Sequence, residues 1–124
     1  MIINFEPGET NILCTRLDKS LHFYRDILNF QFVEEEEGAV RLKCGDGYYL
    51  LLPFAQSQSS ADGYLSVATF SIDLLVNDLE AVVSYFKEND VVFAEDWEAG
   101  KPNFVIRDPD GLFIEVVGKG SSSA

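Results

Sequence analysis

The strongest constraint on the fold is that the second half of the chain repeats the element order of the first half. Matched residues recur in the same order in both halves, as the pairs Leu17 and Leu79, Tyr24 and Phe86, Arg25 and Lys87, Asn29 and Asp90, and Phe32 and Phe93. Near the end of each half, Asp46-Gly47 matches Asp110-Gly111. Matches that keep their order indicate an internal duplication, so two units of the same topology are expected.

The first half predicts a strand, a helix and three more strands. Strand-like apolar runs lie at 10–15, 30–33, 39–43 and 48–52, with a turn at 44–47. After Asp18, a residue suited to cap a helix N-terminus, apolar residues recur at spacings of three and four. Asn29 stands where a left-handed residue ends a helix. The acidic run 34–37 is interpreted as a solvated strand end or turn.

The second half predicts the same order of a strand, a helix and three more strands. Strands are expected at 67–76, 91–94, 103–107 and 112–117, and Asn77 with Glu80 indicates a capping box that starts the helix. The fold class is therefore α+β, with two tandem βαβββ units forming a curved mixed sheet around a pocket. We expect a single domain over 1–118, made of unit one (about 8–53), a polar linker (54–66) and unit two (67–118), and a disordered tail at 119–124.

Charge and hydropathy exclude several classes of partner. The chain carries 9 Lys and Arg against 21 Asp and Glu, a formal net charge of −12. Such a field repels a phosphate backbone and attracts a cationic small molecule, so no nucleic acid partner is expected. No apolar run is long enough to span a bilayer, and the N-terminus lacks the basic region of a signal peptide. A cytoplasmic protein without a membrane partner is expected, with Cys14 and Cys44 as buried thiols.

Two segments resemble the signatures of a known superfamily. The stretch 19–30 (KSLHFYRDILNF) is similar to the SxxFYxxxLGF signature, and 108–116 (DPDGLFIEV) to the DPDGxxIEL signature, of the vicinal oxygen chelate superfamily. This superfamily includes glyoxalase I, extradiol dioxygenases, and fosfomycin and bleomycin resistance proteins. The resemblance covers nearly the whole chain and implies the paired βαβββ fold. It does not specify the function, because one scaffold hosts many chemistries.

The second signature also has a physical reading. In Asp108-Pro109-Asp110-Gly111 the proline presets the first turn dihedral and the glycine accepts a positive φ. Such a turn makes a tight hairpin that leads into a strand. Alternation along this strand places Glu115 on the face opposite Ile114 and Val116.

The resemblance further implies where metal ligands would lie, on the first and last strands of each unit. These positions fall on Glu9 and Leu51 in unit one and on Ser71 and Glu115 in unit two. Two carboxylates alone hold a divalent metal (Zn, Mn, Ni or Fe) weakly, since catalytic sites use three protein ligands. The single histidine, His22, is expected on the exposed side of the first helix. No cofactor is therefore the preferred expectation.

Three functions remain open. The first is metal-free binding of a small cationic or aromatic molecule, as in drug sequestration, by carboxylates and the aromatic residues Tyr48, Tyr49, Phe54, Tyr64, Trp97 and Phe104. The second is a metal-dependent lyase, isomerase or dioxygenase that uses Glu115 as catalytic base or metal ligand, with Glu9. The third is a non-catalytic regulatory or structural dimer.

Two further expectations concern a loop and the assembly. Trp97 lies in a loop before a strand, where it faces the ligand at the pocket mouth or anchors the loop. Relatives in this superfamily are often homodimers, and two half-open sheets leave edges that pairing would cover. A C2 homodimer is therefore expected.

Overall fold

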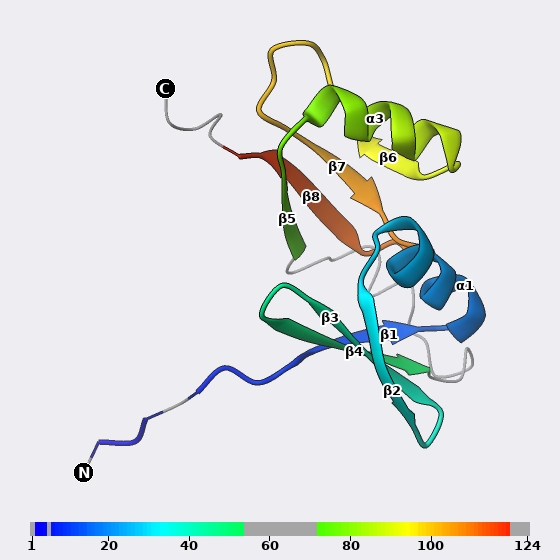
Figure 1. The fold of residues 1–124 in the computed structure, drawn as a ribbon, viewed down its shortest axis with the longest axis vertical. Helices are drawn as coiled ribbons and strands as arrows, with labels where there is room; N and C mark the ends of the chain where they lie inside the picture. The colour runs from blue at the N-terminus through cyan, green and yellow to red at the C-terminus, as the bar shows by residue number, and fades with distance from the viewer. Residues whose placement is uncertain (1, 5, 54–71, 120–124) are drawn as a thin grey trace. The chain divides into compact units, whose positions relative to one another are not determined.

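The chain forms two compact units, Met1–Ala55 and Gln56–Ala124, each built on a four-stranded mixed sheet. The computed structural model describes residues 2–4, 6–53 and 72–119. In each unit a helical segment lies against one face of the sheet (Figure 1). The α+β class and the duplicated βαβββ topology are thereby confirmed.

The described residues of unit one form one helical segment and four strands. Its elements are β1 (Thr10–Cys14), α1 (Leu17–Leu21), the π-helix η1 (His22–Ile27), β2 (Gln31–Glu36), β3 (Ala39–Cys44) and β4 (Gly47–Pro53). The strand order is β1-β4-β3-β2, with β1 parallel to β4 and the other pairs antiparallel. Asp18, expected as the helix cap, lies inside α1 instead, and Arg16 holds the N-cap position.

Unit two repeats this arrangement. Its elements are β5 (Ile72–Val76), α3 (Leu79–Glu88), β6 (Val92–Glu95), β7 (Asn103–Arg107) and β8 (Phe113–Gly118), in the strand order β5-β8-β7-β6. The helix cap was predicted one residue too early. The Asp78 carboxylate, not Asn77, accepts the backbone N–H of Ala81 at 3.1 Å.

Each core lies between the helical segment and one sheet face. Alternate strand residues are buried against the helix, and the matched aromatics Tyr24 and Phe86 supply the helix side. The buried strand residues are Ile12, Cys14, Val40, Leu42 and Leu51 in unit one and Ile72, Phe104, Ile106, Ile114 and Val116 in unit two. The intervening residues form the opposite, more exposed face, which we call the open face.

The π-helix explains why the two halves lose their constant offset at the end of the helix. In η1 the Leu28 N–H donates to the Phe23 carbonyl at 2.9 Å, a bond across five residues. At the end of the helix in unit one, the Phe30 N–H donates to the Tyr24 carbonyl, and in unit two the Val91 N–H donates to the Phe86 carbonyl. The hydrogen bond in unit one therefore spans one residue more than the matching bond in unit two. Unit one therefore accommodates its extra residue as π-helix, and both helices are followed by a left-handed residue at the matched positions Asn29 and Asp90.

A second one-residue difference lies in the last hairpin of each unit. In unit one Lys43 pairs with Tyr48, and the turn between them is formed by residues 44–47. In unit two the equivalent pair is Arg107 and Phe113, and the longer loop 108–112 between them is held by the Asp108 carboxylate, which accepts the N–H groups of Asp110 and Leu112. Gly111 in this loop has φ of 94°, as the sequence predicted.

This longer loop shifts the last strand against the sequence overlay. Ile12 and Leu74 are matched residues on the first strands of the two units. Ile12 pairs with Leu51 on β4, and Leu74 pairs with Val116 on β8. Leu51 is therefore equivalent to Val116 and is buried in the core. The overlay that matched Leu51 with Glu115 was wrong by one residue, and Leu50 takes the position equivalent to Glu115.

Two expectations concern the chain ends and membranes. Strand β8 ends at Gly118, and Lys119, the first residue of the expected tail at 119–124, donates its backbone N–H to the Val76 carbonyl at 2.7 Å. Residues 120–124, the linker 54–66 and the predicted start of a strand at 67–71 lie outside the described residues. In the described ranges no helix is both long and apolar enough to cross a membrane.

One buried polar group gives a test of the unit-one core. Ser20 in α1 is fully buried, and its Oγ has no hydrogen-bond partner among the described residues. An unsatisfied buried hydroxyl destabilises the folded state, so Ser20→Ala should raise the free energy of unfolding by about 1 kcal/mol. Urea denaturation measures this value.

The matched control is Ser84→Ala, which changes an exposed serine of α3. It should gain about 0.5 kcal/mol or less, from helix propensity alone. Equal gains in the two variants would show that the Ser20 hydroxyl is satisfied in solution.

Candidate functional site

In unit two the open face carries a carboxylate held in place by a neighbouring amide. Glu115 is half-buried between the fully buried Ile114 and Val116, so the predicted alternation is confirmed. The Asn103 side-chain N–H donates to Glu115 Oε2. Strand pairing sets the exposed Asp73 directly beside Glu115. Asn103 and Asp73 were not predicted as site residues, because their proximity to Glu115 depends on the register in which β8 pairs with β7 and with β5.

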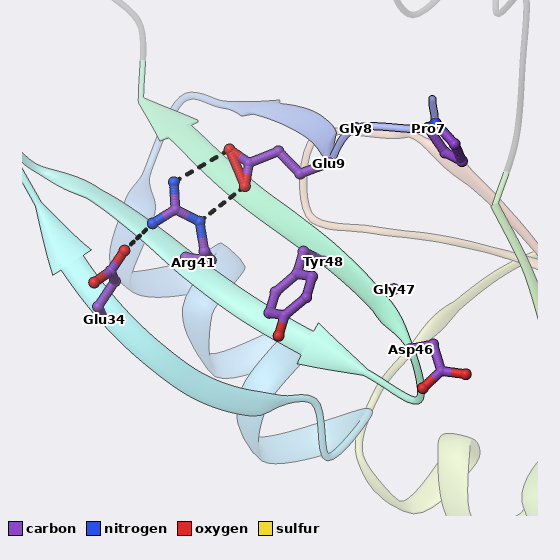
Figure 2. A pocket seen from close by; sticks show the side chains of 8 residues that line it. All are labelled: Pro7, Gly8, Glu9, Glu34, Arg41, Asp46, Gly47 and Tyr48. Atoms are coloured by element: carbon purple, nitrogen blue, oxygen red, sulfur yellow. Dashed lines mark hydrogen bonds and ion pairs between the residues drawn. The ribbon is translucent and has the colours of Figure 1, made fainter. Parts of the chain in front are cut away.

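In unit one the open face contains a hollow of about 680 Å³. It is lined by Pro7, Gly8, Glu9, Glu34, Arg41, Asp46, Gly47 and Tyr48. Figure 2 shows the Arg41 guanidinium between Glu9 and Glu34, with Tyr48 further along toward the turn that carries Asp46. The hollow thus combines acidic, basic and aromatic groups.

The central contact of this hollow is an ion-pair bridge formed by Glu9, Arg41 and Glu34. Arg41 Nε donates to Glu9 Oε2 at 2.8 Å, and Nη2 donates to Oε1 at 3.2 Å, so both carboxylate oxygens of Glu9 are engaged. Nη1 donates to Glu34 Oε2. The side chains of Arg41 and Glu9 are 23% and 29% exposed, so the bridge is partly shielded from solvent.

A β-bulge sets Glu34 opposite Arg41. Along β2 and β3 the register runs from Phe32 paired with Leu42 to Glu34 paired with Arg41, so β2 has one residue more than its partner strand. Without this bulge Val33 would face Arg41. The interpretation of the acidic run 34–37 as a solvated strand end or turn is incomplete for Glu34, because the structure pairs it with Arg41.

The bridge also shifts the pKa values of Glu9 and Arg41. The hydrogen bond from Arg41 lowers the pKa of Glu9 below its ordinary value. The hydrogen bond to Glu9 and the nearby carboxylates of Glu34 and Glu36 raise the pKa of Arg41 further. Both shifts favour the charged forms of Glu9 and Arg41.

The predicted aromatic residues occupy different surroundings. Tyr49 is half-buried, its ring centre lies 5.2 Å from that of Phe30, and burial raises the pKa of its hydroxyl. Tyr48 lies on the open face with 42% exposure, and the Lys43 amine is 5.6 Å from its ring centre. Tyr64 and Phe54 fall outside the described residues.

The remaining predicted positions lie in unit two or on the first helix. Phe104 is fully buried and stacks on Phe93 at 5.4 Å, so it packs the core and we leave it out of the proposed site. Trp97 is partly buried, and its indole N–H donates to the Lys101 carbonyl at 2.8 Å, which anchors the loop. His22 is exposed on the helix, as expected, and contacts Asp26.

The donor set does not fit the metal site that the superfamily resemblance implies. Both oxygens of Glu9 bind Arg41, and the corresponding position on the last strand of unit one is the apolar Leu50. Ser71 lies outside the described residues. Within the residues described, no three His, Cys, Asp or Glu side chains are grouped to hold a metal ion. Glu115 and Asp73 are two donors, fewer than the three usual in a catalytic metal site.

The family comparison identifies the class of protein. Residues 7–116 match the model of the Glyoxalase/Bleomycin resistance protein/Dioxygenase superfamily. The chain therefore belongs to this superfamily, and the resemblance seen in the sequence is confirmed. A search of curated proteins finds no match.

Solved structures support the fold at low sequence identity. Lactoylglutathione lyase from Agrobacterium tumefaciens has a TM-score of 0.68 and 23% identity, covering 94% of this chain and 95% of that one. The trypanothione-dependent glyoxalase I of Leishmania major has a TM-score of 0.75 and 22% identity, covering 93% and 87%. The fosfomycin resistance protein FosX of Listeria monocytogenes, solved with Mn(II) and sulfate, has a TM-score of 0.72 and 12% identity, covering 94% and 91%.

The lowered pKa of Glu9 gives a pH-dependent prediction. A carboxylate with a depressed folded-state pKa stabilises the protein above its unfolded pKa, and this stability is lost as the pH falls through the folded pKa. Glu9→Gln should therefore lower the free energy of unfolding at neutral pH. The difference from wild type should shrink as the pH falls below about 4.3, the ordinary pKa of a glutamate.

Urea denaturation at neutral pH and at about pH 3 measures this difference. The control Glu88→Gln removes an exposed carboxylate at the end of α3, outside the bridge. It should show no comparable dependence on pH. A Glu9→Gln variant as stable as wild type at neutral pH would contradict the account of the bridge.

Proposed function

We propose that the chain is a cytoplasmic, metal-free binding protein of its superfamily that takes a small cationic or aromatic molecule on its open faces. The observation that carries this proposal is the arrangement around Glu115. Asn103 holds one oxygen of this carboxylate, Asp73 lies beside it, and the half-buried Val105 and Val117 share the same face. A fixed carboxylate next to apolar surface suits an amphipathic cation.

The hollow in unit one offers the same combination of groups. Tyr48 presents an exposed aromatic ring, Asp46 and Glu34 contribute negative charge, and the bridge fixes the floor of the hollow. A planar cation gains from stacking on the ring and from the nearby carboxylates. The net charge of −12 further concentrates cations near the surface.

Binding can be tested with chelator-treated protein by isothermal titration calorimetry against bleomycin and a set of planar aromatic cations. Glu115→Gln should weaken binding by about ten- to a hundredfold, because a hydrogen bond to a charged group contributes about 1.5–3 kcal/mol. Glu88→Gln makes the same charge change on α3 and should leave the affinity unchanged.

Metal analysis of protein purified without chelators separates this proposal from the metal-dependent alternative. We expect no stoichiometric Zn, Mn, Ni or Fe in the wild type. A stoichiometric metal that is lost in Glu115→Gln would favour a lyase, isomerase or dioxygenase and would contradict metal-free binding. No response to any cation or metal would leave a non-catalytic regulatory or structural module.

We also propose that the chain forms a C2 homodimer. The edge strand β2 is exposed at all six positions, and its apolar Phe32 and Val33 are 51% and 43% exposed. The edge strand β6 likewise exposes Val92. Edges of this kind are prone to pair with another chain, and a symmetric dimer would cover them.

Size-exclusion chromatography with light scattering should give twice the chain mass of 13.9 kDa. Phe32→Glu places a charge on the edge of β2 and should shift the protein toward monomer. Val92→Glu makes the same kind of change on the edge strand β6. Comparing the two variants shows whether the dimer forms through β2 or through β6. A wild-type monomer at micromolar concentration would contradict the proposed dimer.

A further inference from the structure

The hollow of unit one already holds a cation, and this cation belongs to the chain. Of the five N–H donors of Arg41, three are directed at carboxylates, two at Glu9 and one at Glu34. The carboxylates come from the segment before β1 and from β2, on either side of Arg41 in β3 (Figure 2). Two acidic groups distant in sequence therefore converge on one guanidinium.

This geometry competes directly with an external metal ion. A divalent cation at Glu9 would need at least one of the carboxylate oxygens that now accept from Arg41 Nε and Nη2. It would also sit next to a group whose raised pKa keeps it positively charged. Because Arg41 is tethered to β3, its local concentration near Glu9 does not depend on the solution.

We propose that Arg41 is a built-in counter-cation that excludes divalent metal ions from Glu9 and Glu34, and that removing its charge uncovers a weak divalent-cation site at these two carboxylates. The exclusion of metal ions from unit one then depends on the bridge as well as on the absence of a third ligand among the described residues. The proposal concerns the metal and stands whether or not a cationic ligand binds to the protein.

The test is Mn²⁺ binding to the full-length chain, measured by the electron paramagnetic resonance signal of free Mn²⁺. Arg41→Met keeps an unbranched side chain at this position and removes the guanidinium. This variant should bind Mn²⁺ with a dissociation constant on the order of 10⁻⁴–10⁻³ M, the weak end of the range that oxygen-ligand sites show for Ca²⁺. Wild type should bind at least about tenfold more weakly at this site.

Three controls locate the effect. Arg41→Lys retains the charge and should remain close to wild type. Arg25→Met removes an exposed arginine that pairs with Asp26 outside the hollow, so it makes the same change in net charge and should gain no binding. The double variant Glu9→Gln, Arg41→Met should lose the binding that Arg41→Met gained.

Circular dichroism and thermal unfolding confirm that each variant is folded. A folded Arg41→Met that binds Mn²⁺ no better than wild type would overturn the proposal. Equal gains in Arg41→Met and Arg25→Met would overturn it as well, because net charge alone would then explain the effect. These outcomes leave the titrations with bleomycin unaffected, so the two proposals can fail separately.

Discussion

The structure depends on the parallel pairing of the first and last strands of each unit. This pairing brings together segments separated by the helix and two strands, and it fixes which side chains face the helix. The pairs Ile12–Leu51 and Leu74–Val116 face the helix, so alternation along the strands determines which side chains lie on the open face. Leu50 and Glu115 then hold equivalent positions, and the two units carry different chemistry on the same frame.

Much of the fold could be predicted from the sequence, because the helix and turn signatures are local. The left-handed residue at Asn29 and the turn at Gly111 needed no knowledge of distant contacts. The two one-residue differences were harder. A helix can take up an extra residue as π-helix without losing its apolar stripe, and a longer loop changes strand register while the Asp-Gly pairs still align. Because of this difference in register, the sequence overlay assigned Leu51 to the position equivalent to Glu115, which Leu50 holds in the structure.

The candidate site divides in the same way. Glu115 followed from alternation within one strand, whereas Asn103, Asp73 and the bridge between Glu9, Arg41 and Glu34 follow only from pairing between strands. A β-bulge at Val33 decides that Glu34 faces Arg41. Unit one therefore carries a fixed guanidinium on its open face, and unit two a carboxylate held by an amide. Neither assembles the three-donor set of a catalytic metal site from the described residues.

On the open face of unit one, the Arg41 guanidinium is held by both carboxylate oxygens of Glu9. The most direct measurement is the nuclear magnetic resonance signal of the Arg41 Nε–H, assigned by its loss in an Arg41 variant. A bidentate pair predicts a resolved, slowly exchanging proton whose shift does not change when excess Mg²⁺ is added. A rapidly exchanging proton, or a shift that follows Mg²⁺ concentration, would contradict this account.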